Sequence, residues 1–452
     1  MYHTLTVQVK QKDRLYKWCD TNAHLANNLY NAALFRQRQM MSVSKKEINN
    51  LTFNELEILN EVKTLEDNTN RRISTSGIMS YTYLDALLKY TKNNDYYAKD
   101  LAIQTAQNVL KEVCGAIKGY FASLKSYKSN PTVFSGKPKF PSYKRKKGAT
   151  AFKCSNQDCV IRKTKKGNYY CKLPKTKEIA NLGKKIYGKL IEVHVTPVNG
   201  RYELSFVFDD EQIIEPIKSN DRIIAIDPGI NNLMAVTNNC DLPCMLFNGK
   251  PLKSINQLYN KEIATIVSKN TKGSTDKFVP TKRFKEVTLR RNNQVKDFLF
   301  KSVKVLMNWC VENRIDTIVL GKNTDWKQET NIGKVNNQNF VQIPHDKLYT
   351  MIKYSADRLG IKVIEQEESY TSKASFLDRD DIPTFCDSKK YKFSGKRIKR
   401  GLYKTGERII NADLNGSANI LRKCLPNAFK KDPDFSNITV VKHPDLILSN
   451  SN

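Results

Sequence analysis

The sequence predicts an α/β protein built from more than one domain, and three observations lead to that prediction. The chain has 452 residues, which is too long for one ordinary hydrophobic core. Hydrophobic residues make up 40% of it, enough for packed cores rather than a disordered chain. The order of strand and helix patterns changes after residues 211–221. We therefore place the main domain boundary in this stretch.

The N-terminal half is expected to combine strands with amphipathic helices. Its first ten residues alternate apolar and polar side chains, as a half-buried strand does. A helical pattern begins near Asn22, and residues 101–124 carry an apolar stripe at helical spacing. Residues 42–100 are polar and rich in Asn and Lys, and the sequence leaves their order open. Residues 150–210 have the pattern of several strands separated by turns.

The C-terminal half carries longer apolar strands and amphipathic helices. A strand ends at Asp227, and two further strands follow it closely. The next elements are a helix at about 285–310, a buried strand at 316–321, a helix around 348–359 and a strand at 361–368. Three strands followed by helix, strand, helix and strand match an RNase H-like core, in which a mixed sheet carries helices on its faces.

The charge of the chain indicates a polyanionic partner. Lys and Arg total 76 against 45 Asp and Glu, which gives a formal net charge of +31. An excess of this size repels itself unless a polyanion neutralises it, so we expect a nucleic acid. The alternative is a basic but otherwise ordinary soluble surface.

Cysteine usage and hydropathy indicate the compartment. Ten cysteines are scattered along the chain, and the opening residues lack the apolar region of a signal peptide. No apolar run is long enough to cross a bilayer. We therefore expect a protein of the reducing cytoplasm without a membrane partner.

Residues 136–148 form a basic segment suited to phosphate contact. Two prolines exclude a helix, no acid is present, and Phe140 and Tyr143 lie between the basic side chains, where rings can stack on bases. The alternative is a solvated basic linker. The candidate nucleic-acid contacts are Lys137, Lys139, Tyr143, Lys144, Arg145, Lys146 and Lys147.

Three acidic positions lie at the ends of predicted elements in the C-terminal half. Asp227 ends a strand before Pro-Gly, and Glu367 and Glu368 end another strand. Asp413 lies near the start of a helix. Taken alone, each has an ordinary explanation as a turn aspartate, a solvated pair or a helix cap. Because neighbours on a strand point to opposite faces, only one of the two glutamates can share a site with Asp227.

Together these positions predict a metal-dependent nuclease site. Carboxylates that converge in a basic protein can hold two divalent ions, which activate a water molecule and stabilise the leaving oxygen of a phosphodiester. Mg²⁺ prefers carboxylate oxygens of this kind. We therefore expect two Mg²⁺ ions at Asp227, Asp413 and one glutamate of the pair.

Three segments around these acids resemble the RuvC motifs of the TnpB family. They read IIAIDPGINNLMAV, EESYTSKASFLD and INADLNGSANILRK. TnpB proteins are transposon-encoded relatives of the compact type V CRISPR effectors. The resemblance extends over about 220–430 and is weaker at QTAQNVLKEV and GKPKFPSYKRKK in the N-terminal half.

The resemblance implies a domain arrangement and an activity. It implies a wedge-like β-barrel domain at 1–20 and 131–215, a helical recognition lobe at 21–130 and a RuvC nuclease domain at 216–452. A structured guide RNA would be bound, and double-stranded target DNA that pairs with it would be cleaved. The protein would act in the prokaryotic cytoplasm, on the nucleoid.

The middle acid departs from the common pattern of the family. Many relatives carry it at the end of the earlier strand, where this chain has Gly321. In some relatives a glutamate just before the Thr-Ser-Lys triplet takes its place. Glu368 lies three residues before Thr371 and is therefore assigned the role, with Glu367 as the alternative. The predicted catalytic and metal-binding set is Asp227, Glu368 and Asp413.

A second departure concerns zinc. Relatives often place a four-cysteine ribbon between the last two motifs, and its first pair would fall at Ser375 and Asp378 here. Only Cys386 remains in the insertion 379–410, so we expect no zinc site. The insertion is basic and is either a nucleic-acid-contacting loop or an exposed hairpin. Further expected nucleic-acid contacts are Lys373, Lys396, Arg397, Lys399, Arg400 and Asn415.

Two alternative functions stay open at this stage. A compact type V CRISPR effector would share the chemistry, and only the neighbouring DNA separates it from a transposon nuclease. A non-cleaving RNA-guided DNA-binding repressor would follow if neither glutamate reached the metal ions. The oligomeric state on RNA, the flanking DNA motif and the guide sequence are not predicted.

Overall fold

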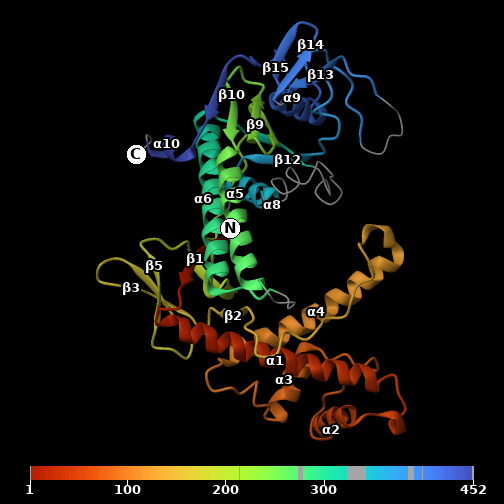
Figure 1. The fold of residues 1–452 in the computed structure, drawn as a ribbon. Coiled ribbons are helices and arrows are strands. Elements are labelled where there is room, and N and C mark those ends of the chain that lie inside the picture. Colours follow the sequence, from red (N-terminus) through yellow and green to blue (C-terminus); the bar gives the residue numbers. More distant parts are fainter. Residues whose placement is uncertain are drawn as a thin grey trace. The chain divides into compact units, whose positions relative to one another are not determined.

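The chain is a mixed α/β protein with several sheets (Figure 1). The computed structural model describes residues 2–212, 214–272, 278–322, 343–384, 391–399 and 401–449. By its internal contacts the chain divides into two compact units, Met1–Gln212 and Ile213–Asn452. In the described ranges, none of the helices combines the length and apolar character needed to cross a membrane.

The N-terminal unit contains helices and two antiparallel sheets. Within residues 2–212, one sheet has the order β1-β7-β6-β2 and the other the order β3-β4-β5. The strands are β1 (Tyr2–Val9), β2 (Phe152–Ser155), β3 (Val160–Lys163), β4 (Tyr169–Lys172), β5 (Ile179–Gly183), β6 (Lys189–Val198) and β7 (Arg201–Asp209). The predicted strands at 1–10 and 150–210 are confirmed. They pair as two separate sheets, and the barrel expected from the resemblance stays a prediction.

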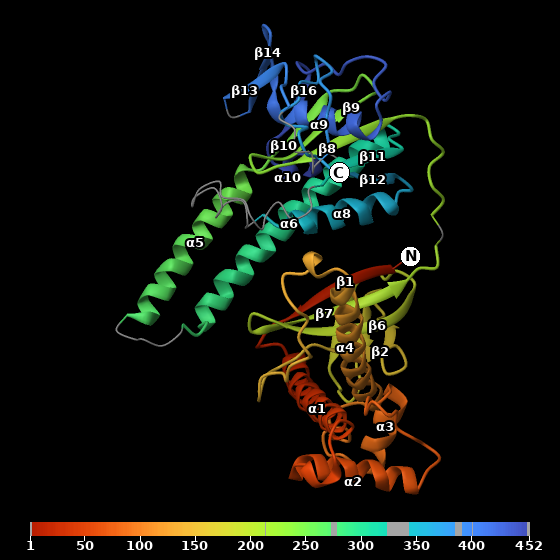
Figure 2. The ribbon, with the colours of Figure 1, turned by 90° about the vertical axis from the view of Figure 1, so that its right-hand side faces the viewer.

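Four helices belong to the same unit: α1 (Leu15–Val43), α2 (Phe53–Asp67), α3 (Tyr81–Tyr90) and α4 (Ile103–Ser129). The predicted apolar stripe of α4 is buried at Ala106, Val109, Val113 and Ile117, where α4 packs against α1 (Figure 2). The undecided region 42–100 contains α2 and α3. Thr52 is the N-cap of α2 and forms a capping box with Glu55. This helix-start signal was present in the sequence but was overlooked because the region is so polar.

The C-terminal unit is built on a mixed sheet. Among the described residues, its strands have the order β12-β11-β8-β9-β10-β16. They are β8 (Ile223–Pro228), β9 (Asn232–Asn238), β10 (Cys244–Asn248), β11 (Thr317–Gly321), β12 (Lys362–Gln366) and β16 (Ile438–Val441). Strands β8, β11 and β12 run parallel, and β9 is antiparallel to β8 and β10.

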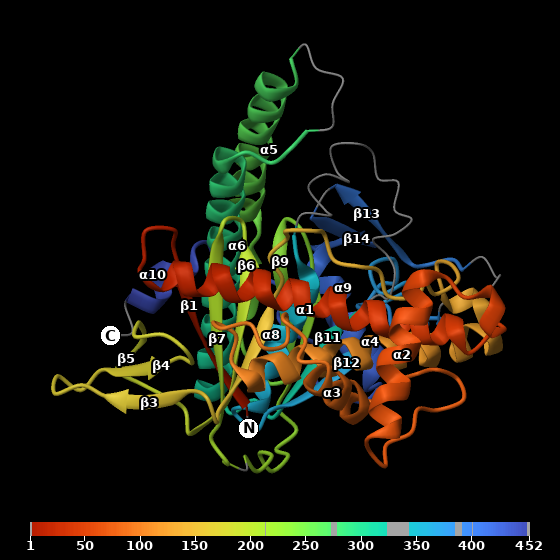
Figure 3. The same cartoon turned by 90° about the horizontal axis from the view of Figure 1, so that it is seen from below.

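The helices described in this unit are α5 (Lys250–Thr271), α6 (Lys282–Glu312), α8 (His345–Asp357), α9 (Ala412–Cys424) and α10 (Pro444–Ser449). Helices α6 and α8 cover one face of the sheet, and α9 covers the other. Ile224 and Ile226 of β8 pack in the core with α6 and α8, whereas Ala225 between them packs with α9. Alternate residues of one strand therefore face different helices, as a central strand requires. Helices α5 and α6 lie side by side as a long antiparallel pair (Figure 3).

The order of elements in this unit agrees with the prediction, with two differences. Three strands are followed by helix, strand, helix and strand, but α5 was not expected between β10 and α6. Strand β12 also ends at Gln366, so both Glu367 and Glu368 lie just beyond it. The described part of the basic insertion forms a small antiparallel sheet of β13 (Gly395–Lys399), β14 (Leu402–Thr405) and β15 (Arg408–Asn411).

Candidate active site

A cavity of about 940 Å³ in the C-terminal unit is lined by Asp227, Glu368 and Asp413. Asp227 lies at the end of β8, Glu368 follows β12 by two residues, and Asp413 lies in the first turn of α9. Because β8 and β12 belong to the same parallel part of the sheet, their carboxyl ends meet at one edge, where α/β folds commonly bind ligands. The structure thus brings all three predicted acids to one cavity.

Asp227 is held by the sheet and approaches the backbone of α9. It pairs with Ala235 of β9 in the antiparallel register. The side chain of His345, at the start of α8, donates a hydrogen bond from Nε2 to the Gly229 carbonyl at 3.1 Å and so fixes the turn beyond β8. A Cβ atom at Gly416 would lie 2.5 Å from Asp227 Oδ2. Gly416 therefore leaves the space that the carboxylate occupies.

Glu368 fills the space above Gly321, the residue that stands where many relatives have the middle acid. A Cβ atom at Gly321 would lie 2.7 Å from Glu368 Oε2 and 3.2 Å from the Ile226 carbonyl oxygen. The Thr371 hydroxyl donates to the Glu368 carbonyl at 2.7 Å and closes the turn that carries the glutamate. A carboxylate from the loop after β12 thus reaches the end of β11, where the strand itself supplies none.

The neighbouring glutamates have different surroundings. Glu367 Oε2 accepts a hydrogen bond from Lys423 Nζ at 2.7 Å, and the Lys423 side chain is only 6% exposed. Burial alone would raise the pKa of Glu367, but the contacts with Lys423 and Ser369 lower it. In the described part of the chain, Glu368 Oε2 is buried without a hydrogen-bond partner. Glu367 is therefore engaged in a structural ion pair, whereas Glu368 is free toward the cavity.

Asp413 does not cap its helix. The Asn411 side chain caps α9 by accepting from the backbone N–H groups of Asp413 at 2.9 Å and Leu414 at 3.1 Å. The Asp413 carboxylate is consequently available to other partners. It accepts from Asn232 Nδ2 at 2.8 Å and from Arg397 at 2.9 Å. Arg397, predicted as a nucleic-acid contact, lines the same cavity as the acids.

Helix α9 is fixed on the sheet by polar side chains. Ser417 donates to the Ala225 carbonyl at 2.9 Å, one turn beyond Asp413. Asn419 donates to the Thr371 and Ala374 carbonyls at 2.9 and 2.8 Å. These bonds set the positions of Asp413 and of the loop after Glu368 relative to β8.

The prediction that Asn415 contacts nucleic acid needs correction. Its side chain is completely buried, donates to the Ala374 carbonyl at 2.8 Å and accepts from the Phe376 N–H at 3.0 Å. Both ends of the amide are therefore used within the protein, and Asn415 holds the loop after Glu368 on α9.

The site concentrates negative charge with little compensation. Burial raises the pKa of Asp227 well above its ordinary value, and the nearby Glu368 and Asp413 carboxylates add to this effect against the opposing Arg397. Burial and the adjacent Glu367 raise the pKa of Glu368 to about 7. Carboxyl groups with raised pKa values in one cavity are typical of sites that bind a cation.

The donor atoms at the cavity are of the kind that a divalent metal ion binds. Asp227, Glu368 and Asp413 supply carboxylate oxygens, and the glycines at 321 and 416 make room for the carboxylates of Glu368 and Asp227, which a Cβ atom would displace. The donors are carboxylate oxygens, which Mg²⁺ prefers. Among the described residues, no three His, Cys, Asp or Glu side chains are gathered into a complete ligand set.

Hydrogen bonds from α1 hold the predicted basic segment, residues 136–148, against that helix. Asn27 donates to the Arg145 carbonyl at 3.1 Å, and Asn31 bonds to both the N–H and the carbonyl of Lys144. Lys144 itself is half-buried, with Nζ 2.8 Å from Glu112 and 3.9 Å from the ring centre of Tyr30. Its ammonium group therefore acts inside the fold. The exposed candidates are Lys137, Lys139, Tyr143, Arg145, Lys146 and Lys147.

The candidates in and near the insertion are mostly exposed. Lys373, Lys396 and Lys399 have exposed side chains, and Arg400 lies outside the described residues, as does Cys386. Where the first zinc pair of relatives would fall, the Ser375 hydroxyl donates to Asp378 at 2.6 Å, and Thr405 bonds to the same carboxylate. A hydrogen-bonded contact thus joins β14 to this loop.

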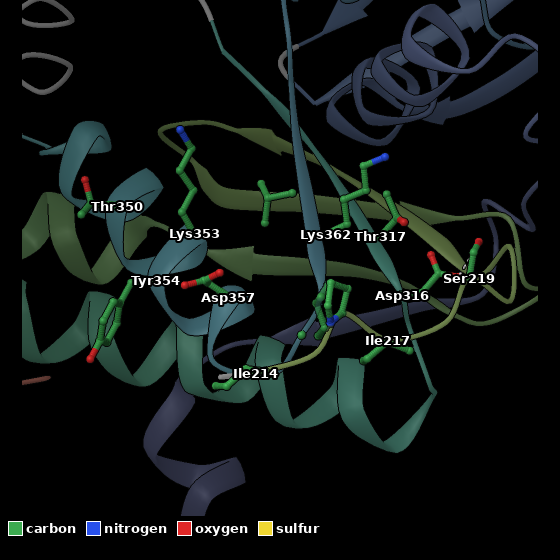
Figure 4. A pocket seen from close by; sticks show the side chains of 14 residues that line it. Ile214, Ile217, Ser219, Asp316, Thr317, Thr350, Lys353, Tyr354, Asp357 and Lys362 are labelled. Atoms are coloured by element: carbon green, nitrogen blue, oxygen red, sulfur yellow. Dashed lines mark hydrogen bonds between the residues drawn. The ribbon is translucent and has the colours of Figure 1, made fainter. Parts of the chain in front are cut away.

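A second cavity, of about 780 Å³, lies at the amino ends of β11 and β12, whereas the carboxylate site lies at their carboxyl ends (Figure 4). Asp316 and Thr317 before and at the start of β11, Lys362 at the start of β12, and Tyr354 and Asp357 near the end of α8 line it. It is therefore separate from the carboxylate site at the carboxyl ends of these strands.

Sequence reasoning missed three residues of the site. Lys423 follows Asn419 by one helical turn, so helical spacing could have placed it on the face that meets the glutamate loop. Gly416 lies three residues beyond Asp413, but nothing in the sequence indicates its approach to Asp227. Asn232 likewise gives no sequence signal for its bond to Asp413.

Comparisons with known proteins match the C-terminal unit most directly. A family model described as a probable transposase matches residues 205–327, and a model of the Cas12f1-like TNB domain matches residues 345–420. A search of curated proteins found no match.

Two of the solved structures that match the chain are complexes of Cas12f proteins. A chain from the cryo-EM structure of the Cas12f1-sgRNA-target DNA complex is 14% identical, with 94% of this chain and 100% of that chain covered and a TM-score of 0.34. A chain from the cryo-EM structure of a CRISPR-Cas12f ternary complex is also 14% identical, with 88% and 80% covered and a TM-score of 0.34.

Proposed function

Because the chain is a TnpB-like protein related to the compact type V effectors, we propose that it is an RNA-guided DNA endonuclease with a RuvC-type active site. The observation that carries the proposal is the convergence of Asp227, Glu368 and Asp413 on one cavity at the carboxyl ends of the sheet. The strand order of the sheet and the helices on both faces support an RNase H-like nuclease domain.

The carboxylates of Asp227, Glu368 and Asp413 would hold two Mg²⁺ ions. When bound, such ions activate a water molecule and stabilise the leaving oxygen of the phosphodiester. The chain's own residues prepare the site: Asn232 orients Asp413, and Arg397 neutralises it. Arg397 also offers a guanidinium group to the phosphate of a bound strand.

The partners of the proposed enzyme are a structured guide RNA and double-stranded DNA. The net charge of +31 and the exposed basic side chains of residues 136–148 support contact with a long polyanion. Base pairing between guide and target would select the sequence, and the protein would hold the backbones. A compact type V CRISPR effector is the alternative of the same chemistry, and a CRISPR array or transposon ends in the neighbouring DNA would separate the two.

A non-cleaving repressor would require that the site lack a working set of acids. Asp227 and Asp413 line the cavity, and Glu368 lies with them, free of the ion pair that engages Glu367. The side chains around the cavity therefore support cleavage over binding alone.

The experiment begins with RNA that copurifies with the protein. That RNA is sequenced, and matching double-stranded DNA is incubated with the complex and Mg²⁺. We expect an enriched structured RNA and cutting of the matched DNA only. Asp227→Asn should abolish cutting, whereas Glu365→Gln, an exposed acid on β12, should not. An absence of enriched RNA, or cutting by the Asp227→Asn variant, would contradict the proposal.

A further inference from the structure

Tyr349 of α8 presents a buried hydroxyl group close to the proposed active site. The residue is 6% exposed and packs in the same core as Ile226 and Leu320, which precede Asp227 and Gly321 on β8 and β11. In the described ranges, its hydroxyl is buried without a hydrogen-bond partner. An unpaired hydroxyl in a core costs free energy. A hydrogen bond that forms when the site binds an ion would offset this cost.

The direction of the tyrosine follows from the helix that carries it. His345 lies one turn earlier on α8 and donates to the Gly229 carbonyl, two residues beyond Asp227. Residues four apart share a helix face, and long side chains lean toward the N-terminus of the helix. The Tyr349 ring is therefore expected to lean toward the first helical turn of α8, which contacts the end of β8 through His345.

The matching acceptor is Glu368. Its Oε2 atom is also buried without a partner in the described part of the chain, and it lies over Gly321 at the end of β11. Burial raises the pKa of Tyr349, and the next largest contributions come from the Glu368 and Asp227 carboxylates. An orphaned donor and an orphaned acceptor thus both lie beside the ends of β8 and β11, the donor packed with Ile226 and Leu320 and the acceptor over Gly321.

We propose that Tyr349 is a positioning residue, whose hydroxyl donates a hydrogen bond to Glu368 Oε2 when the glutamate binds a divalent ion. This bond would hold the carboxylate over Gly321 and direct its other oxygen into the cavity. The proposal rests on the proposed function, because it assumes that Glu368 is a metal ligand. Tyr349 does not touch the substrate. Outer partners of metal ligands typically change metal affinity by 10–100-fold when removed.

The test compares Tyr349→Phe with Tyr354→Phe in full-length protein. Tyr354 lies on the same helix, is 40% exposed and lines the second cavity, so it controls for loss of a hydroxyl from α8. Mn²⁺ binding is measured by the electron paramagnetic resonance signal of free Mn²⁺, and Asp227→Asn, which removes a proposed ligand, is measured alongside. We expect Tyr349→Phe to bind Mn²⁺ about tenfold more weakly. Its Mg²⁺ requirement for cutting should rise by a similar factor, with most activity regained at saturating Mg²⁺.

A double variant separates positioning from packing. If Tyr349 acts through Glu368, then Tyr349→Phe should add no further loss of Mn²⁺ affinity in a Glu368→Gln background. Unchanged Mn²⁺ affinity in Tyr349→Phe, alongside a loss in Asp227→Asn, would overturn the positioning role and leave the proposed function intact. Mn²⁺ binding and cutting that both survive Asp227→Asn would instead overturn the proposed function, and the positioning role with it.

Discussion

Replacing Glu368 by glutamine should make the C-terminal unit more stable in the absence of divalent ions. Burial and the adjacent Glu367 raise the pKa of Glu368 from 4.5 to about 7. Between these values the folded state binds more protons than the unfolded state, so the free energy of unfolding falls as pH rises through this window. Above pH 7 the full cost of the ionised, buried carboxylate is present, and glutamine removes it.

The magnitude follows from the same pKa values. A difference between 4.5 and about 7, at about 1.4 kcal/mol for each pH unit, corresponds to roughly 3 kcal/mol. We therefore expect Glu368→Gln to raise the free energy of unfolding by up to about 3 kcal/mol at pH 8 and to have almost no effect near pH 4.5. With saturating Mg²⁺ the order should reverse, because ions stabilise only the protein that binds them.

Hydrogen–deuterium exchange of the β8 and α9 amides measures this change locally. EDTA removes divalent ions. At each pH, the exchange rates, corrected for the intrinsic exchange rate of each amide, give the free energy of local unfolding. Glu365→Gln is the matched control, since hydrogen bonds from Lys353 and Lys322 lower the pKa of Glu365. It should not stabilise the unit at pH 8. A Glu368→Gln variant that is no more stable than wild type at pH 8, or that gains as much stability at pH 4.5, would show that burial of the ionised Glu368 carboxylate does not destabilise the unit.

Three further predictions concern the same cavity. Mn²⁺ affinity, measured by titration between pH 8 and 5.5, should fall about tenfold for each pH unit below 7, because the ion must displace a proton from Glu368; a flat profile would contradict this. Lys423→Met should lower the free energy of unfolding by about 2 kcal/mol in urea titrations, because Glu367 and two backbone carbonyls lose a buried hydrogen-bond donor. Lys322→Met removes one partner of the more exposed Lys322–Glu365 ion pair and should lower it much less. Gly321→Ala should weaken Mn²⁺ binding while the circular dichroism spectrum is kept, because the added Cβ atom would lie 2.6 Å from Ile420 Cδ1 and 2.7 Å from Glu368 Oε2, and both side-chain ends must move. Undiminished binding would count against the placement of the Glu368 carboxylate.

The convergence of the three acids on one cavity was predictable because each stands at an element end in a motif. Asp227 closes an apolar strand, and Asp413 opens an apolar helix, so their approach follows from the predicted sheet alone. The choice between Glu367 and Glu368 did not follow from strand alternation, because β12 ends before both residues. It depends on Lys423, which lies more than fifty residues further along the chain.

The surroundings of the proposed nucleic-acid contacts were less predictable from sequence. Composition counts Lys144 with its neighbours, but Glu112 and Tyr30 hold its ammonium group inside the N-terminal unit. Asn415 lies two residues beyond Asp413, the proposed metal ligand, yet its amide is used by the Ala374 and Phe376 backbone. For Lys144 and Asn415 alike, the neighbouring sequence predicts a contact with nucleic acid. Contacts with residues far away in the chain engage the side chain within the protein instead.

The most direct measurement is the location of bound Mn²⁺ in a crystal of the protein, from its anomalous scattering. We expect anomalous density enclosed by the carboxylates of Asp227, Glu368 and Asp413, with Glu367 still paired to Lys423. Density beside Glu367, or an absence of density in this cavity at Mn²⁺ concentrations that support DNA cutting, would contradict it.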